Sequence, residues 1–463
     1  MDSPSLSEAL AEFTAGMRLE QLPTQVVDHA RLLLLDALGA ALAGAGTAEA
    51  TSMAEAVRTC AGDGGPSAIW GTGRRTSRAG AALANGTAAH AQELDDFGGC
   101  DHSGAVVVPA ILAAAEGMAV GGDRFLTAMV AGYDVALRVL AAAGGYGQHN
   151  GRGWHSTGTC GSFGAAAAVS AVLGLDPQRT AWALGLAGSF TGGLWAFLED
   201  GAMSKRYHPG RAAETGLLSA HLAAAGFTGP RRVLEAEWGG FLSTYAGTAA
   251  APERITDGLG AEFGILRSGV KPYACCRGAH GAIDVVLDLL RSGAVRAGDV
   301  ARVRVRCSPA NVRLLGDGEP RTRLAAQMSL PYSVGVALVA GRASLAEYED
   351  RRLSDPTVRA ATDRVTLEAD ESVADAEEPY VTVETCDGRT LTGHVDVARG
   401  APENPLSPGE IVAKYEELAG RALSRASVAD VREAALAIEL PGAPKRLLRA
   451  LAGRDRPRPA VFR

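Results

Sequence analysis

Apolar stretches at helical spacing alternate with short polar or glycine-rich breaks through the first half of the chain. The clearest stretch, residues 25–42, follows Pro23 and places apolar side chains every three or four positions, which predicts a helix with one buried face. The same pattern predicts further helices at 79–92, 106–120, 125–143, 165–172, 177–197 and 211–225. The helix at 79–92 is rich in alanine and glycine, so we expect it to pack closely against its neighbours.

A different pattern begins after Gly264. Apolar and polar side chains alternate with the period of two that strands require at 300–306, 365–369, 380–385 and 390–397. Helices are expected between and around these strands at 282–291, 325–341 and 345–348. Helical spacing returns from 409 to 440, after the Pro-containing segment 403–408, whereas the Pro- and Arg-rich tail from Arg454 is expected to fray.

These patterns predict a mainly α protein. We expect a large all-helical domain built from both chain ends, residues 1–265 and 403–463. A smaller α+β domain, residues 266–402, would lie between them in the sequence, and its size is ordinary for one domain.

Length, charge and cysteine content narrow the class of protein. A chain of 463 residues with 47% hydrophobic content exceeds one ordinary core and can fill two or more. A net charge of -7, no basic block and 5% aromatic residues argue against a nucleic-acid surface and favour a small-molecule partner. With no signal-like N-terminus and every long apolar stretch interrupted, we expect a cytoplasmic protein without membrane contact. Seven scattered cysteines predict reduced thiols, with neither disulfides nor a metal site.

One stretch, residues 151–164, combines features that can support chemistry. A glycine-rich approach leads to His155 and then to the hydroxyls of Ser156 and Thr157, directly before the helix expected at 165–172. Glycine lets the backbone come close to a ligand, and hydroxyl or N–H groups at a helix start can bind an anion. Taken alone, the stretch is more typical of a helix cap beside a packed histidine.

A second stretch places three carboxylates, Glu93, Asp95 and Asp96, directly after an apolar helix, with His102 six residues further on. Negative charge at the end of a helix opposes the macrodipole, so a solvated helix end explains these acids poorly. A functional site and a solvated loop remain the two alternatives for this stretch.

A third stretch places Lys205, Arg206 and His208 just before the helix expected at 211–225, with Pro209 suited to its first turn. Cations at this end of a helix are unfavourable unless an anion or a carboxylate lies between them. The alternative is a surface loop with solvated charges. Only four of the 45 basic residues are lysines, and both Lys205 and Lys271 fall in motif-like stretches, where an ammonium differs from a guanidinium.

Taken together, these segments resemble the 2-methylcitrate dehydratase and cis-aconitate decarboxylase family (MmgE/PrpD), which also includes epimerase-like members. The resemblance rests on collinear stretches along nearly the whole chain: Leu94–Asp96 with His102, Gly153–Gly161, Ser204–Gly210, Lys271–Arg277, Ser329–Tyr332 and Glu403–Leu406. It implies an all-helical main domain, a smaller α+β lid domain, a homodimer, and a site between the domains that uses no cofactor.

Members of this family dehydrate, decarboxylate or epimerise small polycarboxylates by moving a proton at the carbon next to a carboxylate. By position, the resemblance implies catalytic roles for His155, His102, Lys205, Lys271 and Asp95. It implies substrate-binding roles for Glu93, Asp96, Phe97, Ser156, Thr157, His208, Cys276 and Arg277. Cations would hold carboxylates and stabilise enolate-like charge while a histidine moves the proton. For His208 and Arg277, a helix-capping histidine and a structural ion pair are the alternatives.

Three positions depart from the family pattern. Glu93 stands where many relatives have aspartate, Phe97 where they have threonine, and Cys276 where the decarboxylase branch has histidine. Phe97 removes a hydroxyl and adds an apolar surface, which favours a substrate less polar than a citrate-like acid. The Cys-Cys-Arg sequence is similar to the epimerase-type branch and disfavours decarboxylation.

We therefore expect a cofactor-independent lyase or isomerase that dehydrates or epimerises a small citrate- or methylcitrate-like acid, in the manner of a 2-methylcitrate dehydratase. One alternative is an enzyme of the same fold acting on a larger, less polar metabolite in a biosynthetic pathway, for which a wide and partly apolar cleft near Phe97 is expected. Another alternative is a non-catalytic carboxylate-binding protein.

Overall fold

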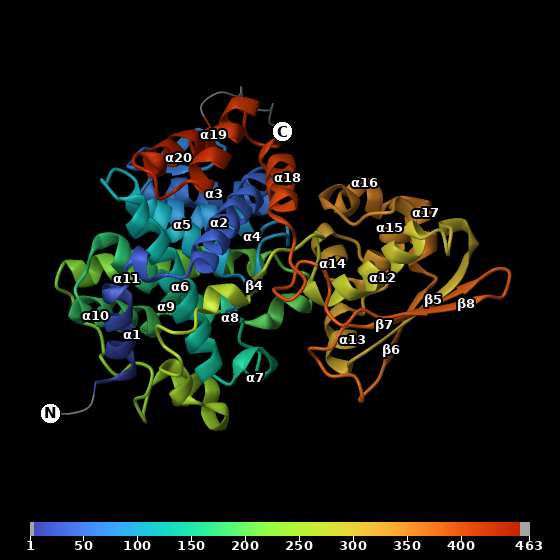
Figure 1. The fold of residues 1–463 in the computed structure, drawn as a ribbon, viewed down its shortest axis with the longest axis horizontal. Helices are drawn as coiled ribbons and strands as arrows, with labels where there is room; N and C mark the ends of the chain where they lie inside the picture. The colour runs from blue at the N-terminus through green and yellow to red at the C-terminus, as the bar shows by residue number, and fades with distance from the viewer. Residues whose placement is uncertain (1–3, 454–463) are drawn as a thin grey trace.

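The computed structural model describes residues 4–453 and consists of a helical body beside a smaller α+β body (Figure 1). Most of the described residues are helical, so the prediction of a mainly α protein is confirmed. The tail from Arg454, which we expected to fray, lies outside the described residues.

The helical body contains most of the helices. Its N-terminal part comprises α1 (Leu6–Gly16), α2 (Thr24–Gly44), α3 (Ala48–Ala61), α4 (Arg78–His90), α5 (Ser103–Ala115), α6 (Gly122–Ala142), α7 (Gly145–Gly151), α8 (Ser156–Thr159), α9 (Gly161–Leu173), α10 (Pro177–Ser189) and α11 (Ser204–Ala224). A small hairpin, β1 (Ser67–Ile69) and β2 (Arg74–Thr76), precedes α4. The C-terminal part adds α18 (Pro408–Ala419), α19 (Arg425–Leu436) and α20 (Ala443–Leu451).

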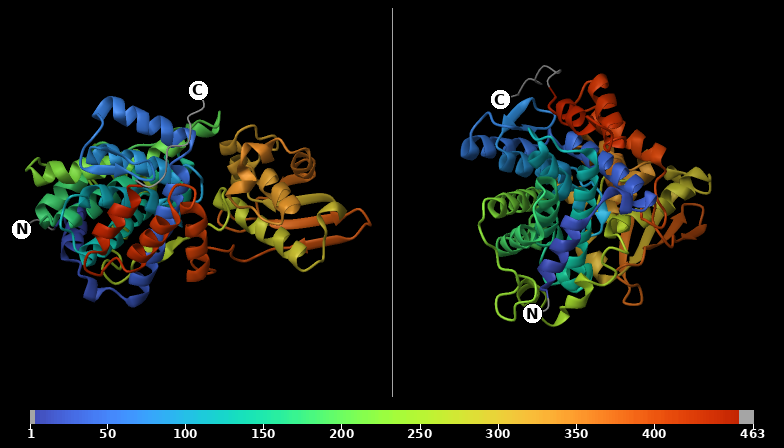
Figure 2. Two further views of the ribbon diagram at one scale, coloured as in Figure 1. Left: turned by 90° about the horizontal axis from the view of Figure 1, so that it is seen from above. Right: turned by 60° about the vertical axis from the view of Figure 1, so that its left-hand side comes forward.

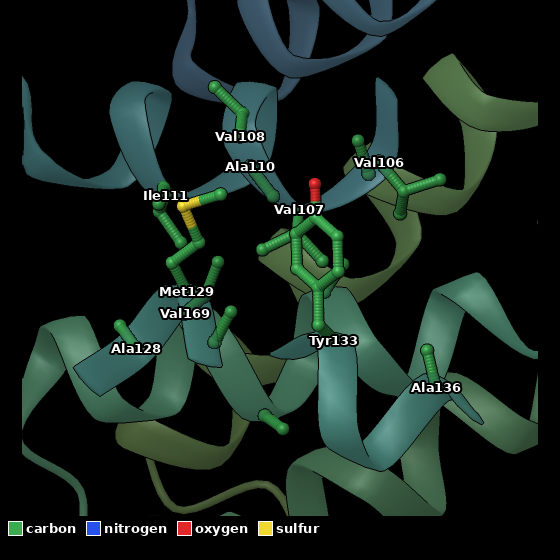
Figure 3. Close-up of a cluster of buried hydrophobic side chains, with 14 of the residues drawn as sticks. Val106, Val107, Val108, Ala110, Ile111, Ala128, Met129, Tyr133, Ala136 and Val169 are labelled. Carbon is green, nitrogen blue, oxygen red and sulfur yellow. The ribbon is translucent and has the colours of Figure 1, made fainter. Parts of the chain in front are cut away.

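Helix α9 lies at the centre of this body and contacts α5, α6, α10 and α11. Its sequence carries no charged side chain, which matches its burial on all sides. Small residues allow the close approach of α6, because a side chain at Gly164 would overlap the backbone of Gly132. Valine, methionine and tyrosine side chains from α5 and α6 fill the remaining space (Figure 3).

The last helices of the chain return to the helical body, as the sequence predicts. Helices α18 and α19 pack against α2, and α20 contacts α6 (Figure 2). Most buried apolar side chains of these three helices belong to the same hydrophobic cluster as those of α1, α2, α4, α5, α6, α9, α10 and α11, whereas those of α3 form a small separate cluster. The two ends of the chain therefore build one core, although the boundaries at residues 265 and 402 stay predictions.

The smaller body has a core of its own, and we refer to residues 266–402 as the lid domain. Its strands are β5 (Val300–Cys307), β6 (Val365–Ala369), β7 (Tyr380–Thr385) and β8 (Thr390–Gly393). They form one sheet in the order β6-β5-β7-β8, in which only β5 and β6 are parallel. Its helices are α12 (His280–Arg291), α13 (Pro309–Leu315), α14 (Arg323–Gln327), α15 (Leu330–Ala340), α16 (Asp350–Leu353) and α17 (Pro356–Thr362).

Two chain segments connect the bodies, one near Ser268–Val270 and the other near Gly400, and they lie side by side. The first segment contains β4 (Ser268–Gly269), which pairs antiparallel with β3 (Phe97–Gly98) of the helical body. The second passes Gly400, whose carbonyl oxygen accepts a hydrogen bond from the Val270 N–H at 2.9 Å. This junction places Lys271 next to the acidic segment 93–97.

The helix expected at 106–120 ends at Ala115, because Glu116 is extended, and three further predicted helices differ from the observed ones. The helix expected at 177–197 ends at Ser189, because the chain turns through Gly193 at a φ of 139° before a 3-10 turn at Trp195–Leu198. The helix expected from residue 211 begins at Ser204, so Pro209 lies inside α11. The helix expected at 325–341 divides into α14 and α15, because the Ser329 hydroxyl caps a new helix by accepting from the Tyr332 N–H.

One helix corrects our reading of the apolar stretches. With 21 residues and a mean hydropathy of 1.5, α6 is long and apolar enough to cross a membrane, contrary to the expectation that every such stretch is interrupted. However, 89% of its apolar window is buried inside the protein, where it forms the core with α5 and α9. The length of α6 is therefore weak evidence for a membrane span.

The union of the two chain ends can be tested at Gly122, the first residue of α6. A side chain there would overlap the carbonyl oxygen of Ile438 in the turn between α19 and α20. We expect Gly122→Ala to lower the free energy of unfolding by about 1–3 kcal/mol, as overpacking usually does. Gly409→Ala is the control, because nothing lies within 4 Å of the new methyl group. Urea unfolding measures both, and equal stability of the two variants would contradict the proposed contact.

Candidate active site

A buried carboxylate, that of Glu93, lies between three cations. Its two oxygens are each 2.8 Å from Lys205 Nζ, and Oε1 is 3.1 Å from Lys271 Nζ. Arg206 forms an ion pair with Oε2. All four side chains are at most 2% exposed. We call Lys205, Lys271 and Arg206 the cation cage.

The cage explains how cations can lie at the start of α11. Lys205 and Arg206 are in its first turn, where the helix dipole is unfavourable for them, and the carboxylate that this arrangement requires is that of Glu93. Burial opposes ionisation of Glu93, but the three cations lower its pKa well below the usual value. Burial likewise opposes a charged Lys271, but Glu93 and Asp95 raise the pKa of this lysine.

Next to the cage, imidazoles and carboxylates alternate in a row. Asp95 lies between His90 Nδ1 at 3.0 Å and His102 Nδ1 at 3.1 Å. Asp101 lies between His102 Nε2 and His155 Nε2, each at 3.3 Å. We call these five residues the histidine row. It reaches the cage through His90 Nε2, which is 3.3 Å from Arg206 Nη1.

The protonation states of His102 and His90 follow from the atoms that their ring nitrogens contact. Both nitrogens of His102 face carboxylate or carbonyl oxygens, so both must donate. Burial alone would lower its pKa, but Asp101 and Asp95 raise it. His90 instead donates to Asp95 and accepts from Arg206, which requires the neutral ring, and burial lowers its pKa well below the usual value.

His155 is the neutral member at the other end of the row. Its Nδ1 is 2.9 Å from His208 Nδ1, so one ring must donate to the other. If His208 donates, His155 keeps a proton on Nε2, which faces Asp101 at 3.3 Å without the geometry of a hydrogen bond. Burial lowers the pKa of His155, and it lowers that of His208 to about 3. The row thus holds a charged imidazole and a neutral one on opposite sides of Asp101.

Asp95 and Asp101 are ionised, whereas Asp96 holds a proton near neutral pH. Burial opposes ionisation of Asp95 and Asp101, but the imidazoles that flank each of them lower both pKa values. Asp96 faces away from the row, accepts from the Gly104 N–H at 2.9 Å, and lies beside the Tyr133 hydroxyl. Burial, together with the charges of Asp95 and Asp36, raises the pKa of Asp96 to about 8.

The other predicted residues divide between the site and the junction. The Thr157 hydroxyl donates to Asp101 at 3.2 Å, while the Ser156 hydroxyl is held by Asn150 at 3.2 Å. Cys276 lies near the cage, and burial raises the pKa of its thiol.

Phe97 and Arg277 lie in the junction and contact each other. Phe97 is 8% exposed and packs with its ring 5.2 Å from the Arg277 guanidinium carbon. Arg277 forms an ion pair with Glu378 of the lid, which is the structural role that the sequence left open. The wide apolar cleft that one alternative placed near Phe97 does not fit this closely packed ring.

Sequence reasoning did not select His90, Asp101 or Arg206 as site residues. His90 ends α4 and turns back to Asp95 five residues later, so its position in a helix expected to continue to Gln92 concealed it. Asp101 adopts a φ of 88°, which is uncommon for a residue other than glycine. Its place between two histidines far apart in the sequence is the signal that only the fold provides.

A cleft of about 580 Å³ opens beside the cage, between the helical body and the lid. Phe197 and Leu198 line one side, and Leu324 and Met328 the other. The Met328 sulfur is 3.8 Å from Lys205 Nζ, and the Phe197 ring lies 5.9 Å from both Lys205 Nζ and the His155 ring. Phe197 and Met328 therefore separate the cleft from the cage and from the nearest histidine of the row, and each of them contacts both sides.

Two overlapping sets of side chains have the atoms that could hold a metal ion. The nitrogen and oxygen atoms of His90, Asp95 and His102 lie within 4.8 Å of one another, as do those of Asp101, His102 and His155. A metal needs unprotonated ligands, whereas the raised pKa of the shared His102 favours a proton. The expectation of a site without metal stays a prediction.

Two family models match most of the chain. The model of the MmgE/PrpD N-terminal domain matches residues 8–253, and that of the C-terminal domain matches residues 273–440. The chain belongs to the MmgE/PrpD family. The C-terminal family domain includes α18 and α19, which pack in the helical body here.

Similar curated proteins are named as decarboxylases. The cis-aconitate decarboxylase-like protein oryM of Aspergillus oryzae is 30% identical, with 97% of this chain and 98% of the relative aligned. The cis-aconitate decarboxylase of Aspergillus terreus is 29% identical over 95% and 94% of the two chains. The human cis-aconitate decarboxylase is 26% identical over 91% and 89%.

The histidine row predicts a titration that depends on Asp101. Because Asp101 raises the pKa of His102, Asp101→Asn should move the midpoint of His102 to lower pH in an NMR titration of its ring protons. A raised folded-state pKa contributes stability that is present below the ordinary value of 6.5 and is lost as the pH rises through the raised one. The free energy of unfolding of the variant should therefore decrease less than that of wild type as the pH rises through this range. Asp176→Asn, at the exposed start of α10, is the control, and an unchanged His102 midpoint in Asp101→Asn would refute the assignment.

A second titration concerns Asp96. Its folded-state pKa of about 8 lies above the ordinary value of 3.8, so the folded protein keeps a proton that the unfolded chain loses as the pH rises. Asp96 therefore lowers stability progressively from about pH 4 to about pH 8. Asp96→Asn removes this effect, and its free energy of unfolding relative to wild type should rise with pH by up to about 1.4 kcal/mol per unit. Urea unfolding at several pH values measures it, and a difference that does not vary with pH would contradict it.

Proposed function

We propose that this protein is a lyase that acts on a small carboxylic acid and moves a proton at the carbon next to a carboxylate. Family membership and the decarboxylase names of the relatives support a lyase. The observation that carries the proposal is Asp101, which holds a protonated His102 and a neutral His155 on its two sides. A proton donor and a proton acceptor are thus available at one place near neutral pH.

In this mechanism His102 gives a proton to the substrate carbon, and the pair of His155 and His208 takes one up at His208 Nε2, because both nitrogens of His155 are already engaged. Asp101 orients both rings and balances the charge that moves between them. Lys205 and Lys271 stabilise negative charge as the substrate becomes enolate-like. A buried cationic site strengthens this effect, because little water screens it.

The same two imidazoles serve either way of breaking the substrate. In decarboxylation, the bond from carbon to carboxylate breaks, CO₂ leaves, and the carbon receives a proton from His102. In dehydration, an imidazole takes the carbon proton and hydroxide leaves from the neighbouring carbon. The names of the relatives favour decarboxylation, whereas the Cys276 sequence pattern favours dehydration or epimerisation.

Several further properties belong to this proposal. They are independence from cofactors, a cytoplasmic location and a homodimer without nucleic-acid or membrane partners. Large apolar side chains are exposed close together in the sequence before and within α11, which supports pairing with a second copy. They are Phe190, Leu194, Leu198, Met203, Tyr207 and Leu218.

The proposal is tested by incubating the protein with a panel of di- and tricarboxylic acids in D₂O and following the carbon-bound protons by NMR. We expect turnover of at least one acid, with deuterium at the carbon next to a carboxylate. His102→Gln should lower kcat/KM about 10²- to 10⁴-fold, since it removes the proton donor.

His394→Gln is the matched control, because His394 stacks on Tyr380 in the lid sheet, away from the row. Its kcat/KM should equal that of wild type. Full activity of His102→Gln would remove the proposed donor. Binding of acids without any turnover or exchange would favour the non-catalytic carboxylate-binding protein instead.

A further inference from the structure

The cation cage already contains a carboxylate. Glu93 accepts from Lys205 with both oxygens and from Lys271 and Arg206 with one each. These contacts are those that a substrate carboxylate would make with the same three groups.

Glu93 is held in this place by more than its side chain. Its carbonyl oxygen accepts from Lys271 Nζ at 3.2 Å, and its backbone has a φ of 52°. The residue is 1% exposed. A second carboxylate in the cage would lie against Glu93 in a site with little screening by water, where two like charges repel strongly.

The charges of the surrounding groups limit how many further carboxylates the site can bind. The cage and protonated His102 supply four cations, against the anions Glu93, Asp95 and Asp101. One positive charge remains uncompensated, while Asp96 holds its proton near neutral pH. The site as built therefore balances one additional carboxylate.

The side of Lys205 that Glu93 leaves uncovered is apolar. Its Nζ is 3.8 Å from the Met328 sulfur and about equally far from two rings, 6.0 Å from Trp195 and 5.9 Å from Phe197. Beyond them lies the cleft of about 580 Å³, in which Leu198 and Leu324 lie next to the apolar residues and charged side chains lie further out. The charged residues are Glu199, Asp200, Arg313, Asp317, Glu319 and Arg321.

We propose that Glu93 takes the place of a substrate carboxylate in the cation cage and so excludes acids that need this subsite. The substrate class is then an acid with one or two carboxylates and an apolar segment, which lies in the cleft between Phe197 and Met328. This inference rests on the proposed function, since it names the substrate of the same site.

The first experiment measures binding of propane-1,2,3-tricarboxylate to the full-length protein by calorimetry. Glu93→Gln empties the cage of negative charge, and we expect at least tenfold tighter binding than in wild type. Glu49→Gln is the matched control. Glu49 is also a buried carboxylate paired with an arginine, Arg323, and it lies close enough to interact with Arg206 of the cage, but it is outside the cage. Binding by this control should equal that of wild type.

Glu93→Asp provides a second variant should Glu93→Gln fail to fold. It keeps the charge but withdraws the carboxylate by one methylene group, and we expect at least threefold tighter binding of the tricarboxylate. Unchanged or weaker binding in the Glu93 variant that folds would overturn the proposal. An equal gain in Glu49→Gln would also overturn it, because the effect would then be one of general charge.

The second experiment compares succinate, 2-hexylsuccinate and the tricarboxylate as ligands of the wild-type protein. We expect 2-hexylsuccinate to bind at least tenfold more tightly than succinate, because its chain buries apolar surface in the cleft. Tighter binding of the tricarboxylate than of 2-hexylsuccinate would overturn the substrate class.

The two proposals fail in different ways. If Glu93 does not fill a subsite, wild type still turns over an acid, but the variants bind the tricarboxylate no better. If the protein is not a lyase, the Glu93 variants still gain binding, but no acid in the panel exchanges a proton.

Discussion

The arrangement of the site depends on the carboxylate of Glu93. Without it, three cations with side chains at most 2% exposed would face one another, and burying unpaired charge costs several kcal/mol per ion. Glu93 comes from the loop after α4, Lys205 and Arg206 from the first turn of α11, and Lys271 from the start of the lid domain. The Glu93 side chain therefore holds three parts of the chain together. Because it occupies the cation cage, it also limits the space that a ligand carboxylate can use there.

In the histidine row, the alternation of carboxylates and imidazoles decides which rings carry an additional proton. Asp95 and Asp101 each lie between two imidazoles, so each ring receives its protonation state from the neighbours it touches. His102 lies between two ionised carboxylates and is charged, whereas His90 and His155 each face one carboxylate and one further partner and are neutral. A proton donor and a proton acceptor thus arise from position in the row, within a site where burial alone would make all three rings neutral.

The sequence predicted which elements form and which charged segments meet, but not how the charges pair. Period-two alternation located all four strands of the lid sheet, and helical spacing located the main helices. The need for a carboxylate beside Lys205 and Arg206 followed from the helix dipole, yet nothing local identified Glu93 as that carboxylate. Asp101 was missed because its partners lie at positions 102 and 155, directly before α5 and α8, and only the fold brings them together. Pro209 misled the start of α11, since a proline inside a helix is uncommon enough to be taken for its first turn.

Two neighbouring residues of the lid, Gln327 and Met328, cover the cation cage. The position of the lid therefore affects the charged groups of the cage. Gln327 accepts from Arg206 at 3.3 Å and donates to the carbonyl of Gln92 at 2.7 Å, while Met328 covers Lys205. Withdrawing this segment would admit water to the cation cage, weaken each ion pair with Glu93, and lower the cost of moving that side chain. A second pair at the junction, Lys414 with Asp36 at 2.6 Å, follows the same logic, although Lys414 is only partly buried. Three of the four lysines in the chain are therefore paired there. A compact ammonium suits these places, because one lysine can serve several oxygens at once where a planar guanidinium would need a matched edge. Three of the four lysines are therefore found where the two bodies meet, and the lid covers the charges of the site.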